Sequence, residues 1–553
     1  MKIEKNRVSN KLGTHFLNFI DKLILMIILF LVLIFIFFPI ISVISESFIV
    51  NGKFTLDIYK SLLNKNIILL KNSLFVAILT TIISTLLSIA ISIYISFTNS
   101  KYKKILTTIL MLTMISPPFV SSLAYISLFG RRGFITHNIL GLTVNTYGWQ
   151  GIVAMQSLGF TSLNALMLIG FINGMDKSLF NSSLDLGGNS SYTIAKIVIP
   201  LMRPGIIVVG LLTFVRSLAD FSTPIIIGGS FNVLATQAYL NVVAYSDLPM
   251  AAAISILLFI PAIIAFILYR IFLKDSNIIT GTNFREESSE TMLRIEGFFP
   301  RVLQIITYLF LIMMILQYLS IFISAMTKQK FGTMYFTFDN IKESKNYISG
   351  SFIRSVLYSL IAGVVGSIIG FLISYYLEIR KIKGMKIIDF ISTMPYIIPG
   401  TFFGLGYILA FNKYPLALTG TGLIVILNCI FKQLPLPTKA SSAVISQINP
   451  QVTEASKDLG AHNMYVLKDV IIPMSKSAFL ISFVNNFTTT MTTIGSIIFL
   501  VYPGKKLATL VMFDAIQSGK YRIGSVIACM IILITLFVNI IFSKFLLEER
   551  NVY

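Results

Sequence analysis

Long apolar runs separated by short polar stretches make up most of the chain. A helix needs about 20 apolar residues to cross a bilayer, whereas the strands of a membrane barrel alternate apolar and polar residues. Because the runs are continuous, they predict transmembrane helices, with ends placed to within about three residues. Twelve segments qualify: Leu23–Val43, Ser73–Thr98, Ile105–Leu128, Gly151–Asn173, Gly205–Ile227, Met250–Leu273, Val302–Met326, Ser355–Leu377, Ile387–Phe411, Leu423–Val444, Ser477–Val501 and Ile523–Leu546.

A change in composition marks the midpoint of the chain. Residues 274–301 are polar and charged, and six apolar runs lie on either side. We therefore predict a first transmembrane domain at residues 1–273, a cytoplasmic linker at 274–301 and a second transmembrane domain at 302–553. The predicted fold is an all-α integral membrane protein with twelve helices in two homologous halves related by pseudo-two-fold symmetry.

The loops indicate an orientation. The first run is too long for a signal peptide and no small-residue cleavage site follows it, so we interpret it as an uncleaved helix. Lys and Arg favour the side that the N-terminus occupies, notably at residues 1–22, 101–104 and 380–386. This bias places both termini in the cytoplasm. Lysines within residues 53–71 and 328–345 oppose it.

Composition excludes most soluble classes. Hydrophobic residues make up 55% of the chain and charged residues 12%, against roughly 25% charged residues in soluble domains. The net charge of +21 is scattered between apolar runs, which favours contact with anionic lipid over nucleic-acid binding. The two cysteines and three histidines are dispersed, so their spacing predicts no metal site, cofactor or disulfide.

An internal repeat lies between the fourth and fifth run of each half. Residues Asn181–Arg203 read NSSLDLGGNSSYTIAKIVIPLMR, and residues Glu454–Lys476 read EASKDLGAHNMYVLKDVIIPMSK. Duplication at matching positions favours a docking element for a two-fold symmetric partner over a covered loop without a partner. An Asp-Leu-Gly triplet and a later proline occupy the same places in both copies: Asp185, Leu186, Gly187 and Pro200, then Asp458, Leu459, Gly460 and Pro473.

Each copy predicts a short helix, a turn and a second amphipathic helix on the cytoplasmic face. Gly187 and Gly460 suit the left-handed conformation that ends many helices. Pro200 and Pro473 are expected to interrupt the second helix before the following membrane span.

The two copies resemble the EAA loops of ATP-binding-cassette importer permeases, in which E-A-A-x-x-x-G precedes I-x-L-P. The second copy is close to this pattern, whereas the first has Asn181 and Ser182 in place of Glu-Ala. The resemblance implies that each loop presents a coupling helix to one subunit of a cytoplasmic ATPase dimer. The residues it assigns to this contact are Ser183, Asp185, Leu186, Gly187, Pro200, Glu454, Ala455, Asp458, Leu459, Gly460 and Pro473.

Three further segments look like the two-domain ferric iron permeases: Ser116–Gly133, Leu218–Gly229 and Thr488–Gly504. Permeases for 2-aminoethylphosphonate, thiamine, sulfate and polyamines share parts of these patterns, so a small anion or polyamine stays open as the cargo. The resemblance implies a fused permease pair in the cytoplasmic (inner) membrane. It also implies an extracytoplasmic substrate-binding protein and alternating access driven by ATP.

No G-x-x-x-x-G-K-[ST] phosphate-binding loop occurs in the sequence. We therefore expect a transport subunit and not an enzyme, with ATP hydrolysed by a partner.

Polar side chains inside the predicted spans are candidates for the translocation path, because a charge in the bilayer core is costly. Arg216 and Asp220 lie four residues apart, which predicts either a gate or a self-neutralising ion pair on one helical face. Lys432 either faces an anionic or chelated substrate, or binds carbonyls freed by the two prolines that follow it. The repeat places Thr489 opposite Arg216 and Thr493 opposite Asp220.

Prolines recur in the third run of each half. Pro117 and Pro118 in the first half, and Pro395 and Pro399 in the second, predict matched kinks. Such kinks can mark the translocation pathway or a hinge, or they can serve helix packing alone.

Two other classes of protein fit the sequence less well. A gradient-driven transporter needs intramembrane acidic residues, for which Asp220 and Asp389 are the only good candidates, and twin loops would have no purpose in it. A membrane enzyme would need clustered His, Asp, Glu or Cys residues, which the sequence does not contain.

Overall fold

The computed structural model describes residues 2–550 except 51, 99, 114–117, 132, 144, 276–297, 331–332, 349 and 503. Most of the predicted linker at 274–301, and Pro117 of the first proline pair, therefore lie outside the described residues. Helices dominate the described chain, and two short β-hairpins accompany them. The predicted all-α membrane class is confirmed.

Two compact units make up the chain, and each includes the first long helix of the opposite half. Unit 1 contains Met1–Ser45, Ile353–Lys505 and Thr535–Tyr553. Unit 2 contains Glu46–Phe352 and Lys506–Ile534. The first helix of the chain thus belongs with the second half, and the first helix of the second half belongs with the first half.

Unit 2 is a helical bundle with both hairpins. Its elements are β1 (Ile49–Val50), β2 (Lys53–Phe54), α3 (Asp57–Lys65), α4 (Ile67–Phe97), α5 (Ser100–Thr113), α6 (Pro118–Phe129), the π-helix η2 (Phe134–Ile139), α7 (Trp149–Asn173), α8 (Ser178–Asp185), α9 (Ser190–Thr193), the π-helix η3 (Ile194–Val198), α10 (Ile199–Ala219), α11 (Ser222–Ile227), α12 (Leu234–Val243), α13 (Leu248–Asp275), α14 (Phe298–Ala325), β3 (Thr327–Lys330), β4 (Thr333–Phe336), α15 (Asp339–Ile348), α25 (Ala508–Gln517) and the first part of α26 (Tyr521–Arg550).

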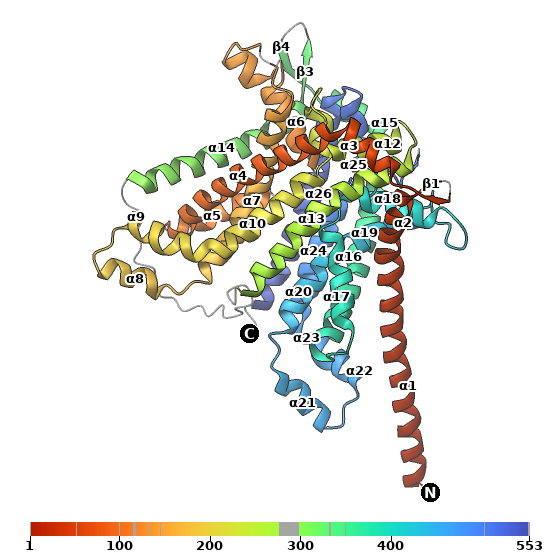
Figure 1. Ribbon diagram of the computed structural model, residues 1–553. Helices are drawn as coiled ribbons and strands as arrows, with labels where there is room; N and C mark the ends of the chain where they lie inside the picture. Colours follow the sequence, from red (N-terminus) through yellow and green to blue (C-terminus); the bar gives the residue numbers. More distant parts are fainter. Residues whose placement is uncertain are drawn as a thin grey trace. The chain divides into compact units, whose positions relative to one another are not determined.

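Unit 1 takes the remaining elements. They are α1 (Lys2–Val32), the π-helix η1 (Leu33–Phe37), α2 (Phe38–Phe48), α16 (Ser351–Ser374), the π-helix η4 (Tyr375–Ile379), α17 (Met385–Thr393), the 3-10 helix η5 (Met394–Tyr396), α18 (Gly400–Phe411), α19 (Gly422–Gln433), α20 (Pro435–Ile445), α21 (Pro450–Asp458), α22 (Asn463–Tyr465), the π-helix η6 (Val466–Ile471), α23 (Ile472–Met474), α24 (Lys476–Thr492) and the end of α26. In this unit α1 contacts α17 and α22 (Figure 1).

Eight helices in the described ranges are long and apolar enough to cross a membrane. The predicted count of twelve is not confirmed, although every predicted run contains helix. A ninth span results if Met385–Tyr396 and Gly400–Phe411, which bend by 114°, count as one. The eight are His15–Phe48, Ile67–Phe97, Trp149–Asn173, Ser190–Ala219, Leu248–Leu268, Phe298–Ala325, Ser351–Ile379 and Tyr521–Phe542.

The predicted span Gly205–Ile227 is wrong at both ends. The helix begins at Ser190, because the second helix of the repeat continues into the span without a break. It ends at Ala219, where Asp220 adopts an extended conformation and caps the next short helix.

Two spans of the second half differ from the prediction, one by ending early and one by being divided. Helix α24 ends at Thr492, and turns follow within the expected span Ser477–Val501. The expected span Leu423–Val444 is divided into α19 and α20 at Leu434, because Pro435 cannot donate a backbone hydrogen bond.

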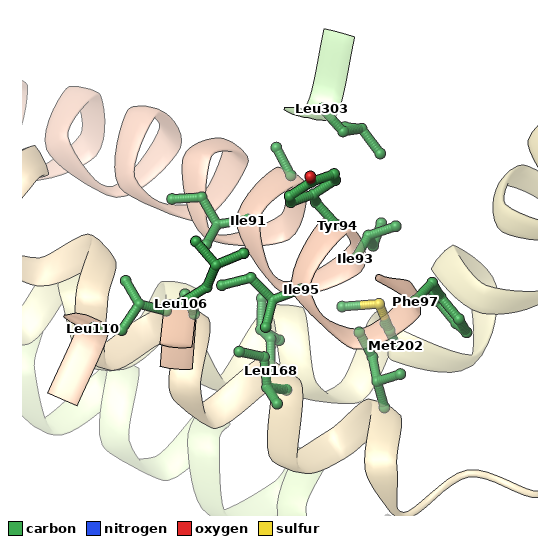
Figure 2. Close-up of a cluster of buried hydrophobic side chains, with 14 of the residues drawn as sticks. Ile91, Ile93, Tyr94, Ile95, Phe97, Leu106, Leu110, Leu168, Met202 and Leu303 are labelled. Atoms are coloured by element: carbon green, nitrogen blue, oxygen red, sulfur yellow. The ribbon is translucent and has the colours of Figure 1, made fainter. Parts of the chain in front are cut away.

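An apolar cluster forms the core of unit 2 (Figure 2). Its side chains come mainly from α4, α5, α7, α10 and α14, and α8 and η3 of the first repeat copy also contribute. Because Leu303 of α14 belongs to this cluster, the first helix of the second half is anchored by side chains of the first half. The labelled members are Ile91, Ile93, Tyr94, Ile95, Phe97, Leu106, Leu110, Leu168, Met202 and Leu303.

The first connection of each half has the same form. Hairpin β1–β2 precedes α3, and hairpin β3–β4 precedes α15. The hydroxyl of Thr55 accepts a hydrogen bond from the Asp57 N–H at 3.1 Å, and Thr337 does the same for Asp339 at 3.1 Å. The internal repeat therefore extends beyond the two loops.

Candidate functional site

The first repeat copy folds as α8, a tight turn and α9. The turn is a Schellman motif, in which the Gly187 N–H donates to Leu184 O and the Gly188 N–H donates to Ser183 O, both at 2.9 Å. Gly187 has a φ of +84°, a conformation that disfavours any residue with a Cβ. The prediction of a left-handed glycine at this position is confirmed.

The second copy has the same geometry. At the end of α21 the Gly460 N–H donates to Lys457 O at 2.8 Å, and the Ala461 N–H donates to Ser456 O at 3.0 Å. Gly460 also has a φ of +84°. The two loops are therefore alike in backbone conformation and not in sequence alone.

Matching polar side chains cap the helices of both loops. Asn189 Oδ1 accepts from the Tyr192 N–H at 2.8 Å, and His462 Nδ1 accepts from the Met464 N–H at 3.2 Å. A π-helix follows in each case, η3 in the first loop and η6 in the second. Single π-turns inside longer helices are frequent at functional sites.

Each loop also begins with a capping side chain. The carboxylate of Asp176 accepts from the Ser178 N–H at 2.9 Å, and this bond together with the Ser178 hydroxyl lowers the pKa of Asp176. In the second loop, Asn449 Oδ1 accepts from the Gln451 N–H at 3.0 Å.

Each loop exposes a leucine and a tyrosine at matching places. Leu186 is 88% exposed and Leu459 is 90% exposed. Tyr192 and Tyr465 are 56% and 52% exposed. The two tyrosines were not among the predicted loop residues, although each lies five residues after the glycine in its copy of the repeat. Whether these side chains form a docking surface stays a prediction.

The other residues assigned to the loops differ in exposure. Asp185, Asp458 and Glu454 are exposed, as is Ala455. Ser183 is instead buried, and its hydroxyl lies 2.8 Å from the Thr193 hydroxyl, which holds α8 against α9. This serine therefore shapes the first loop from within.

The expected interruption at the two prolines occurs in one loop. Pro200 lies at the start of α10 within the continuous helix Ser190–Ala219, and the π-turn before it accommodates the missing N–H. Pro473 lies in α23, which ends at Met474 before α24 begins.

The expectation that Arg216 and Asp220 share a helical face is wrong, because α10 ends between them. Asp220 Oδ1 accepts from the Ser222 N–H at 2.9 Å, and Oδ2 accepts from Gln156 Nε2 at 2.9 Å. Asp220 therefore caps α11 and ties it to α7. Whether Arg216 or Asp220 meets the cargo stays a prediction.

Lys432 lies in the last turn of α19 and binds carbonyl oxygens. Its Nζ donates to Pro395 O at 2.5 Å and to Ile398 O at 2.6 Å. Its ammonium also lies 5.7 Å from the ring centre of Phe403. The carbonyls belong to the bend between α17 and α18, and not to the prolines that follow Lys432.

Asp389, one of the two acidic residues considered for a gradient-driven transporter, has a basic partner. Lys439 Nζ donates to both carboxylate oxygens of Asp389 at 2.8 Å. Lys432 and Lys439 thus both reach the segment formed by α17 and η5.

Thr489 makes a local hydrogen bond, since its hydroxyl donates to Asn485 O at 2.7 Å. Thr493 follows the last residue of α24 in an extended conformation. Their assignment to the translocation path stays a prediction. No group of three His, Cys, Asp or Glu residues that could hold a metal is found in the described part of the chain.

These features describe a multi-pass helical membrane protein with two repeated helix–turn–helix loops. The family described as "Binding-protein-dependent transport system inner membrane component" matches residues 88–276 and 364–546. The chain belongs to this family, and it is a permease subunit of the ATP-binding-cassette type.

Among its relatives, the chain is similar to two ferric transport permeases. "Ferric transport system permease protein FbpB" of Actinobacillus pleuropneumoniae is 29% identical over 458 residues, covering 77% of this chain and 64% of that protein. "Putative ferric transport system permease protein FbpB 1" of Haemophilus influenzae is 31% identical over 410 residues, covering 71% and 63%. The chain therefore spans less than two thirds of the length of these relatives.

Sulfate permeases match a smaller part of the chain. "Sulfate transport system permease protein CysT" of Escherichia coli is 22% identical over 209 residues, covering 35% of this chain and 75% of that protein. The resemblance to ferric permeases predicted from the sequence motifs is confirmed.

Proposed function

We propose that this chain is the membrane subunit of an importer for ferric iron, with separate ATPase subunits supplying the energy. The observation that carries the proposal is the pair of matched loops, each with a Schellman turn and an exposed Leu and Tyr. The ferric cargo is supported by the two relatives whose names specify ferric transport.

Two copies of one ATPase fit the two loops. Leu186 and Tyr192 in the first loop correspond to Leu459 and Tyr465 in the second, so a symmetric dimer would meet the same side chains twice. Closure of an ATP-bound dimer would draw the loops together and open the path outward, and hydrolysis would reset it. The permease needs different contacts in these two states and no tight hold on the cargo in either.

The proposed topology has both termini and both loops in the cytoplasm. Permease domains at residues 1–273 and 302–553 are joined by a cytoplasmic linker at 274–301. The two hairpins with α3 and α15 then face outward, where an extracytoplasmic binding protein would deliver the cargo. The lysines that opposed the charge bias lie on or beside these elements.

Another cargo is the main alternative. Similarity to sulfate permeases favours a small anion such as sulfate or 2-aminoethylphosphonate, and a polyamine also remains open. A gradient-driven mechanism has less support, because Asp389 is engaged by Lys439 and Asp220 by Gln156 and Ser222.

The test uses the full chain in lipid nanodiscs with the ATPase and binding protein encoded beside it. ATP hydrolysis is measured with binding protein loaded with Fe(III), sulfate or 2-aminoethylphosphonate. We expect stimulation by the iron-loaded form, and loss of the ATPase complex in the variant Leu186→Glu with Leu459→Glu. Both leucines are exposed, so the fold should survive. Leu142→Glu, at a leucine that is 45% exposed outside the loops, is the matched control.

Each contrary outcome has a distinct meaning. Stimulation by sulfate or the phosphonate alone would keep the importer and replace its cargo. Absence of any ATPase complex, together with uptake that an uncoupler abolishes, would overturn the proposal in favour of a gradient-driven transporter.

A further inference from the structure

Helix α24, which follows the second loop, carries polar side chains on several sides. On one side Asn485, Thr489 and Thr492 donate to carbonyls of their own helix at 3.0, 2.7 and 2.9 Å. On another side, the Thr488 hydroxyl accepts from Asn539 Nδ2 of α26 at 2.9 Å. These groups are satisfied within the protein.

On a third side of α24, buried polar side chains lack hydrogen-bond partners among the described residues. Ser482, Asn486 and Thr490 follow one another at intervals of four residues and therefore form a line along the helix, here named the α24 polar line. They are 0%, 1% and 3% exposed. The Ser482 and Thr490 hydroxyls, and both amide atoms of Asn486, have no hydrogen-bond partner among the described residues.

The α24 polar line meets α16 at Asn486. A Cβ at Gly366 of α16 would lie 2.4 Å from Asn486 Nδ2, so the amide occupies space that the glycine leaves open. A Cβ at Gly363 would lie 2.9 Å from the ring of the neighbouring Phe483. Polar groups shut between helices in a bilayer carry a free-energy cost, because no water is present to bind them. Such groups need an explanation beyond packing.

The corresponding helix of the first half shows that the fold does not require unsatisfied groups at these places. The repeat aligns Thr213 of α10 with Asn486, and Ser217 with Thr490. Thr213 accepts from Asn164 Nδ2 at 2.7 Å, and the Ser217 hydroxyl donates to Gln156 Oε1 at 2.6 Å. The polar side chains at these two positions therefore have hydrogen-bond partners in the first half and lack them in the second.

We propose that the α24 polar line is the part of the translocation path contributed by the second half. The line is buried in this conformation and meets water and cargo when α24 moves away from α16. This inference rests on the proposed function as a permease. On α24 it favours this line over Thr489, because Thr489 lies on the satisfied side.

The chemistry of the line restricts the cargo. Amide and hydroxyl groups donate and accept hydrogen bonds but carry no charge. They can bind water or ligand oxygens around an ion, whereas they cannot replace the hydration shell of a bare trivalent cation. The cargo class is therefore an ion that keeps its water or an oxygen-rich chelate during passage.

The first test compares line variants with neighbours of the same chemistry. Asn486→Leu and Thr490→Val change the line, and Asn485→Leu and Thr492→Val are the matched controls on the satisfied side. Uptake is measured in proteoliposomes with the ATPase and iron-loaded binding protein, and the thermal midpoint is measured for each variant. We expect the line variants to lose at least ten-fold in uptake with an unchanged or raised midpoint, because an unpartnered polar group is replaced by an apolar one. The controls should keep uptake within two-fold.

Unchanged uptake in both line variants would overturn the inference. A midpoint that falls together with uptake would also overturn it, since the line would then be structural.

The second test measures whether position 486 is accessible to water. In a background without Cys429 and Cys529, Asn486→Cys is treated with a water-soluble thiol reagent, with and without a trapped ATP analogue. We expect labelling in one nucleotide state and protection in the other, with Asn485→Cys showing no such switch. If Asn486→Cys is inert in every state while the parent transports iron, this inference fails and the proposed function stands. If no ATPase complex forms at all, both fail.

Discussion

Lys432 is held at the bend of a broken span by two carbonyl oxygens, Pro395 O and Ile398 O. Lys432→Met leaves both without their donor, and each buried unsatisfied group costs about 1–3 kcal/mol. Lys439→Met breaks an ion pair in which the lysine is 55% exposed, and such a pair contributes about 1 kcal/mol or less. We expect Lys432→Met to lower the thermal midpoint in nanodiscs clearly more than Lys439→Met. Equal losses would contradict this account of the bend.

Single residues also show why sequence spacing misleads. Arg216 and Asp220 are four residues apart, and hydropathy alone continues the helix through both. The helix ends at Ala219 because the Asp220 carboxylate accepts from the backbone of Ser222 and Thr223, a local capping pattern that competes with helix continuation. An Asp followed closely by Ser-Thr-Pro was a readable signal of this cap. The partner Gln156, which comes from α7, was not readable, because it depends on tertiary packing.

At the scale of elements, α16 approaches its neighbours through glycines. A Cβ at Gly370 would lie 2.5 Å from Pro437 Cβ and 2.8 Å from the backbone nitrogen of Thr438 in α20. A Cβ at Gly210 of α10 would meet nothing nearer than 3.7 Å. We expect Gly370→Ala to destabilise the protein by about 1–3 kcal/mol through overpacking. Gly210→Ala should be neutral or stabilise it by about 0.5–1 kcal/mol. Thermal unfolding of both variants checks this, and a tolerated Gly370→Ala would refute the close approach.

Elements defined by local chemistry could be predicted, and those defined by packing could not. The loops were predicted because Gly187 and Gly460 signal a helix end within their own few residues. Pro435 indicated a break in the helix, although the predicted span continued through it. The π-turns η3 and η6 carry no composition signal, since they accommodate one extra residue within an otherwise ordinary helix.

At the scale of the whole molecule, hydropathy predicted where the helices lie in the sequence. It did not predict which helices pack together in the fold. Helix α1 belongs to unit 1 and α14 to unit 2, and the polar contacts of α1 were not readable from hydropathy. Asp21 makes such contacts, and the predicted first span began after it, at Leu23. The structure extends that span back to His15, which puts Asp21 inside the helix and 7% exposed. A buried carboxylate needs specific partners, and these lie in the second half of the chain.

The last prediction concerns the contact that holds α1 in unit 1. Arg380 donates to Asp21 Oδ2 at 2.7 Å, and the Tyr376 hydroxyl donates to Asp21 Oδ1 at 3.0 Å. Removing one partner of such a pair leaves a buried charge uncompensated, which costs about 2–5 kcal/mol. We expect Asp21→Ala and Arg380→Ala each to lower the thermal midpoint, and the double variant to be no worse than the more damaging single change. Additive losses in this double-mutant cycle would mean that the two residues act independently. Helix α1 would then be held by apolar packing alone, and the buried charge would need another explanation.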